Sequence, residues 1–143
     1  MAKKGISPIV ATLLLVALVV TLSSVIFITA RQFIGEVVTK NGMPAEQACE
    51  GISLSAIYSG GELQLTNNGD IPVHKFTAGV TSLSTGDFEA MPYEEAILAG
   101  GSASVSIFDA SAIEITPWVL GENDEGQSAV FECTDKVFIA EIY

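Results

Sequence analysis

Few residues in this sequence combine the types and spacing that chemistry requires. The single histidine, His74, stands beside Lys75 in a strand-like run, where a packed or solvent-exposed residue is a simpler interpretation than a catalyst. No cysteine and histidine spacing matches a zinc site, and no glycine-rich run has the pattern of a phosphate-binding loop. We therefore expect no catalytic residues, no enzymatic activity and no cofactor.

One acidic segment has the composition of a cation-binding loop. Residues 121–126 read GENDEG and contain three carboxylates, those of Glu122, Asp124 and Glu125. Oxygen ligands at that density can hold Ca²⁺, but their order does not match an EF-hand. The sequence therefore predicts an acidic surface turn. We assign no metal and keep these three residues only as a weak candidate site.

The charge is divided unevenly along the chain, whose net charge is −11. Residues 1–40 carry four basic side chains against Glu36 alone, a net charge of +3. Residues 41–143 carry only Lys75 and Lys136 against 16 carboxylates, a net charge of −14. A domain this acidic repels phosphate backbones, so we exclude nucleic acid as a partner. The charge suits either a domain that stays soluble at high salt or one that binds cations.

An uncharged apolar segment fills most of the N-terminal part. Residues 6–30 contain no charged side chain, and about 20 apolar residues suffice to cross a bilayer as a helix. The run is longer than the apolar region of a cleaved secretory signal, which spans roughly 7–15 residues. Ser7 can serve as N-cap and Pro8 as the first helical residue, and Asn41-Gly42 as the C-terminal cap. This predicts one helix over residues 6–41, in which serine and threonine hydroxyls bond back to their own backbone.

The last turns of this predicted helix carry an apolar stripe. Phe33, Ile34, Val37 and Val38 recur at helical spacing among polar residues. The helix would be ~50 Å long, whereas the bilayer core takes only about 30 Å of it. The excess would present the stripe to a partner, or it would be the short stalk of a plain membrane anchor.

The first thirty or so residues resemble the N-terminus of archaeal type IV pilins and pilin-like proteins. Lys3-Lys4-Gly5 is followed directly by Ile6 and the sequence SPIVATLLL. In that family a class III signal peptide is cut by a prepilin peptidase after a basic-basic-small tripeptide. The resemblance implies that Lys3, Lys4, Gly5 and Ile6 form the processing site and that Ile6 becomes the mature N-terminus. Bacterial type IV pilins usually carry Glu five residues into the mature chain, where this sequence has Val10.

The same resemblance implies a function and a domain organisation. Residues 1–5 would be the leader, 6–41 a transmembrane and filament-core helix, and 42–143 an extracellular domain. The protein would be a membrane-anchored precursor that meets prepilin peptidase and the pilus assembly machinery, then forms a helical homo-oligomer serving adhesion or surface attachment. The alternative is a single-pass anchored extracellular binding module that does not polymerise. The expected assembly surface consists of Ile9, Leu13, Val16, Val20, Phe27, Phe33, Ile34, Val37 and Val38.

Short alternating runs separated by turn residues fill the C-terminal part. Residues 52–58 and 62–66 alternate at period two around Gly60-Gly61, which predicts a β-hairpin. Further strands are predicted, with no helix, and Pro72 and Pro117 are expected at edges or strand beginnings. The predicted fold class is α+β, a long N-terminal hydrophobic helix followed by an all-β antiparallel sandwich, immunoglobulin-like in outline. The further predicted strands are residues 73–83, 102–108, 113–120, 129–133 and 137–142.

Two cysteines, Cys49 and Cys133, flank nearly all of this predicted sandwich. If the domain lies outside the membrane, a disulfide between them is expected. Closing a loop of that length would contribute about 4 kcal/mol in the chain-entropy model. The alternative is a pair of buried free thiols.

Overall fold

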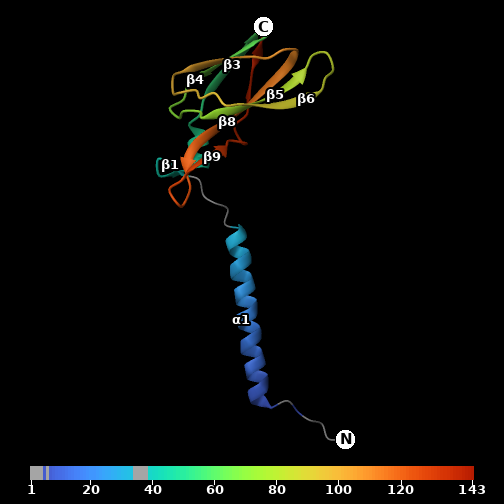
Figure 1. The fold of residues 1–143 in the computed structure, drawn as a ribbon, viewed down its shortest axis with the longest axis vertical. Helices are drawn as coiled ribbons and strands as arrows, with labels where there is room; N and C mark the ends of the chain where they lie inside the picture. The colour runs from blue at the N-terminus through green and yellow to red at the C-terminus, as the bar shows by residue number, and fades with distance from the viewer. Residues whose placement is uncertain (1–4, 6, 34–38) are drawn as a thin grey trace. The chain divides into compact units, whose positions relative to one another are not determined.

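The computed structural model describes residues 5, 7–33 and 39–143, and the chain divides into two compact units, Met1–Glu36 and Val37–Tyr143. The first unit contains α1 (Pro8–Phe33), an uninterrupted helix in Figure 1. The second contains two β-sheets and one short helix. The predicted fold class, a long apolar helix followed by a β-sandwich, is confirmed.

The start of α1 matches the sequence prediction. Pro8 is its first residue, and the carbonyl oxygen of Ser7 accepts the first helical hydrogen bond from the Ala11 N–H at 3.0 Å. Four hydroxyls inside the helix donate to carbonyl oxygens three or four residues earlier at 2.8–3.0 Å, as expected for hydroxyls in an apolar environment. They belong to Thr12, Thr21, Ser24 and Thr29.

The prediction that the helix continues to residue 41 is wrong. Thr39–Lys40 forms β1, which pairs with β2 (Met43–Pro44) in a two-residue hairpin. Asn41 and Gly42 have φ angles of 53° and 78°, the combination that a type I′ turn requires and that Asn-Gly favours. The dipeptide that the sequence analysis assigned to a helix cap is therefore a hairpin turn. Residues 34–38 lie outside the described residues.

The domain's strands form two sheets, of seven and four strands. The larger has the order β2-β1-β8-β5-β6, with β9 and β10 also pairing with β8. The smaller has the order β11-β3-β4-β7 and is antiparallel except that β11 runs parallel to β3. The larger sheet's remaining strands are β5 (Lys75–Ser82), β6 (Phe88–Tyr93), β8 (Ala110–Glu122), β9 (Ser128–Glu132) and β10 (Phe138–Ile139). The smaller sheet comprises β3 (Leu54–Ser59), β4 (Glu62–Asn67), β7 (Ser102–Ser106) and β11 (Glu141–Ile142).

Alternation along the strands builds the core between the two sheets. In β3 and β4 every second side chain is buried, including Leu63 and Leu65 at 0% exposure. Phe76 on β5 and Ile113 and Ile115 on β8 supply the facing layer and are equally buried. The period-two pattern read from the sequence thus identifies the inward faces correctly.

Strand β8 is hydrogen-bonded along both edges, and Pro117 lies inside it. The prediction that Pro117 marks an edge or a strand beginning is therefore wrong. Its carbonyl accepts the Cys133 N–H at 2.9 Å, and in an antiparallel strand the nitrogen of a residue faces the same edge as its oxygen. The missing N–H of Pro117 therefore falls between β10 and β9, and no hydrogen bond to β5 is lost.

Three further elements differ from the predictions. Helix α2 (Ala45–Glu50) has six residues, too few to show a helical period in the sequence. Strand β6 was not predicted; it contains Pro92, which an edge strand tolerates. Residues 137–142, predicted as one strand, form two short ones, because the chain leaves the larger sheet at the buried Ala140 and joins the smaller sheet.

Asn67, at the end of β4, is a polar side chain with 0% exposure. Its amide group donates to the carbonyl oxygens of Ile71 at 2.8 Å and Ile97 at 3.3 Å. Its side-chain oxygen accepts the Gly69 N–H at 3.0 Å. One buried side chain thus satisfies three backbone groups in the two loops that leave β4 and precede β7.

We predict that Asn67→Leu destabilises the domain by about 2 kcal/mol, because the part-buried Gly69 N–H and Ile71 carbonyl would lose the side chain that bonds them. Urea unfolding of the full chain in detergent, followed by tryptophan fluorescence, measures this change. The neighbouring Asn68 donates to Ser55 on the exposed surface, so Asn68→Leu should cost less than about 1 kcal/mol. Equal effects of the two substitutions would contradict the assigned role of Asn67.

Candidate membrane and assembly surface

Helix α1 is apolar around its whole circumference and exposed along its length. Its large apolar side chains from Ile9 to Ile28 are 46–71% exposed, and the span Pro8–Ala30 is long and apolar enough to cross a membrane. Of its polar side chains up to Thr29, those of Thr12, Thr21, Ser24 and Thr29 bond back to the helix as described above. A helix apolar on every face is stable only in lipid or against other helices.

The expected assembly residues lie on α1 as far as the structure describes them. Ile9, Leu13, Val16, Val20 and Phe27 are 57–71% exposed. Apolar residues at other positions on the helix are exposed to a similar degree, so exposure alone does not single out one stripe. Phe33 is the last residue of α1, and Ile34, Val37 and Val38 lie outside the described residues.

The expected processing site is described only in part. Gly5 is exposed, and a Cβ placed on it would meet no atom within 4 Å. Lys3, Lys4 and Ile6 lie outside the described residues. Access to Gly5 is compatible with cleavage after it, and the role of the four residues remains a prediction.

The acidic segment at residues 122–125 is the tip of the hairpin between β8 and β9. Its geometry is organised by Asn123, whose side-chain oxygen accepts the N–H groups of Glu125 at 3.1 Å and Gln127 at 2.8 Å. The amide oxygen that could have served as a ligand is therefore used by the turn itself. The part of the chain that the structure describes contains no group of three or more His, Cys, Asp or Glu side chains placed to hold a metal ion. This applies to the weak candidate site of Glu122, Asp124 and Glu125 as well.

The residues around His74 form a surface cluster. The His74 N–H donates to the Trp118 carbonyl at 2.8 Å, which ties the start of β5 to β8. The ammonium of Lys75 lies 4.7 Å from the centre of the Trp118 ring and 3.3 Å from a carboxylate oxygen of Glu94. Trp118 in turn donates its indole N–H to Thr77 at 3.1 Å. Cation–π and ion-pair contacts of this kind stabilise a sheet face and need no catalytic explanation.

The structure also shows a site that the sequence analysis missed, where the loop after β5 meets the loop before β8. Asp109 has a φ of 57°, and its carboxylate accepts hydrogen bonds from the hydroxyls of Ser82, at 2.6 Å, and Ser84. The Ser82 bond and then the Ser84 bonds hold the pKa of this exposed carboxyl below its usual value. A hollow of about 370 Å³ lies beside it, over Val80 and Met91. No local motif marks this site, because the residues that meet there are about 25 positions apart.

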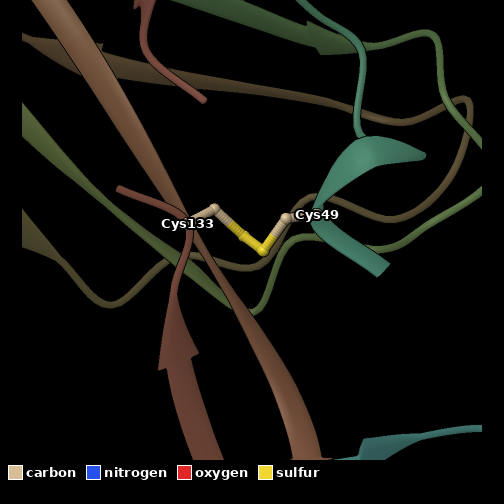
Figure 2. Close-up of a disulfide and its surroundings, with 2 residues drawn as sticks. All are labelled: Cys49 and Cys133. Carbon is tan, nitrogen blue, oxygen red and sulfur yellow. A yellow bond between two sulfur atoms is a disulfide. The ribbon is translucent and has the colours of Figure 1, made fainter. Parts of the chain in front are cut away.

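The predicted disulfide is present and closes the domain. Figure 2 shows Cys49 on α2 joined to Cys133, which directly follows β9. The two Cα atoms are 5.6 Å apart, and the sequence separation is 84 residues. Both cysteines are buried, at 5% and 2% exposure. The bridge therefore encloses every strand from β3 to β9.

Comparisons with protein-family models and with curated proteins find no match to this chain.

The hydrogen bonds to Asp109 predict a dependence of stability on pH. Because the pKa of Asp109 is lower in the folded protein than its usual 3.8, its stabilisation is present above that pH and is lost as pH falls through the folded value. Asp109→Asn should lower the melting temperature at about pH 6 and converge with the wild type at about pH 2. Thermal unfolding followed by circular dichroism measures both. Asp87→Asn makes the same charge change in the same region and serves as the control. If it reduced the pH dependence of the melting temperature as much as Asp109→Asn does, the role assigned to Asp109 would be contradicted.

Proposed function

We propose that this protein is a structural subunit of an archaeal type IV pilus-like surface filament. It would be held in the membrane as a precursor, cut after Gly5 by a prepilin peptidase, and assembled through α1 into a helical homo-oligomer that serves adhesion or surface attachment. The observation that carries this proposal is the exposure of apolar side chains on every face of α1.

The energetics of α1 support an environment of lipid or neighbouring helices. Burying one Leu, Ile or Val side chain is worth about 1.5–3 kcal/mol, and α1 exposes more than ten of them. The sum far exceeds the stability of an ordinary domain, about 5–15 kcal/mol. A helix of this kind can move from a bilayer into a bundle of identical helices without exposing its side chains to water, which is what assembly of such a filament requires.

The leader residues and the domain support the same proposal. Lys3 and Lys4 would hold the precursor's N-terminus on the cytoplasmic side, and their removal would lower the barrier to leaving the membrane. The domain after residue 38 has its own core and a disulfide, as expected of a part that folds outside the cell. Its residues 41–143 carry a net charge of −14, which favours solubility over association through the domain.

The first measurement is the intact mass and N-terminus of the protein from membrane and sheared-filament fractions of its native host. We expect a chain that starts at Ile6, lacks the two thiol hydrogens of Cys49 and Cys133, and is recovered in the sheared fraction. An uncut chain found only in membranes would favour the anchored binding module. Loss of about thirty residues would indicate a secreted soluble domain, since a secretory signal is roughly 15–30 residues long.

Assembly through α1 predicts a specific sensitivity to charge. Leu15→Asp, near the middle of the apolar span, should abolish filaments, because a carboxylate there costs about 3 kcal/mol at a bilayer centre. Electron microscopy of sheared fractions reports filaments, and resistance of the β-domain to trypsin without reductant reports its folding. Ser111→Asp places the same charge on an exposed strand position of the domain and should leave filaments intact. Filaments of normal length and number from Leu15→Asp would exclude assembly through α1.

A further inference from the structure

The segment through which the chain enters the domain is weakly attached. No side chain in residues 39–44 is buried, and the first buried residue is Ala45. Apart from its hairpin partner β2, strand β1 pairs with the larger sheet through a single register pair, Thr39 with Glu122 on β8. Two side-chain bonds are added, from the Thr39 hydroxyl to the Glu122 carbonyl at 3.3 Å and from the Lys40 ammonium to the Leu120 carbonyl at 2.8 Å. Exposed contacts of this number open at low free energy.

The disulfide lies directly behind this weak segment. Cys49 is buried in α2 together with Ala45 and Ala48, and it is bonded to Cys133. The Cys133 N–H donates to the Pro117 carbonyl on β8. The preceding strand β9 pairs with β8 over five register positions, and β8 pairs with β5 on its other edge. A covalent bond thus connects Cys49 on α2 to Cys133 (Figure 2), the residue directly after β9.

We propose that the Cys49–Cys133 bridge is a mechanical clamp. This rests on the proposed function, in which α1 is held in a membrane or filament and tension enters the domain at Thr39. Tension first detaches β1, β2 and the start of α2, and then meets Cys49. Under force between the two ends of the domain, the bridge passes the load directly to Cys133 and on to the residues that follow it. The 84-residue loop containing β3 to β9 therefore lies outside the load path and cannot be extended.

The clamp also explains why the bridge joins these two positions. Outside the closed loop lie only the entry segment and the residues after Cys133, which form the two-residue strands β10 and β11. We call these two segments, one before Cys49 and one after Cys133, the arms of the domain. Both arms can detach without opening the ladders among β3, β4 and β7 or among β5, β6, β8 and β9. A bridge that began later in the chain would leave one of these ladders exposed to unzipping from the entry side.

Force spectroscopy on the full chain in bicelles, with handles at both termini, tests the proposal. In the oxidised protein the domain should extend by ~7 nm, since only about 20 residues lie outside the loop at roughly 3.5 Å each. The Cys49→Ala/Cys133→Ala variant should give an additional ~29 nm from the loop. Extension of α1 contributes equally to both proteins and cancels in the comparison. Reducing the wild-type protein during pulling should reproduce the variant's extension, which covers the case in which the variant does not fold.

Two results would overturn the clamp. One is an oxidised domain that extends to the same length as the variant. The other is an oxidised domain whose core unfolds in the same step, and at the same force, as the arms detach. Trypsin cleavage within the loop under load reports that unfolding. Failure of the filament proposal is seen separately, because absence of filaments or of cleavage after Gly5 does not change the extension of the isolated chain.

Discussion

The structure depends on one constraint: α1 cannot be solvated by water. More than ten large apolar side chains are exposed on it, and their transfer free energies of about 1.5–3 kcal/mol each sum to more than the folding free energy of a typical domain. The helix therefore requires an environment of lipid or of other apolar helices. The second unit has a hydrophobic core and paired sheets of its own.

The domain is held together by β8, Asn67 and the disulfide. Strand β8 pairs with β1, β5, β9 and β10 and so organises the larger sheet. Asn67 connects the loops around β4 and β7 through hydrogen bonds to three backbone groups, two of which, the Gly69 N–H and the Ile71 carbonyl, are part-buried. The bridge from Cys49 to Cys133 then restricts the unfolded chain, which matters most in a domain of about 100 residues with limited buried area.

Much of this architecture could be predicted from the sequence because its signals are local. The uncharged run and the Ser7-Pro8 start predicted α1, and the alternation around Gly60-Gly61 predicted the hairpin of β3 and β4. What failed depended on partners far along the chain. Asn41-Gly42 is compatible with a helix end and with a hairpin turn, and only the pairing of Thr39 with Glu122 selects the turn. Likewise Pro117 can lie inside β8 only because its nitrogen faces the interval between two other strands, and the Ser82–Asp109 contact has no sequence motif.

Charged residues are distributed very differently between the two parts of the chain. Of the 17 carboxylates, 16 lie in residues 41–143. The span Pro8–Ala30 of α1 carries none of the ionisable residues that a bilayer excludes, and Arg31 follows it directly. If helices of neighbouring copies pack together, domains carrying −14 on residues 41–143 are brought near one another. Their repulsion is screened over about 8 Å at physiological ionic strength and over about 3 Å at 1 M salt. In the proposed filament, helix packing would supply the attraction and the domains would oppose it, so that association would be strongest where salt is high.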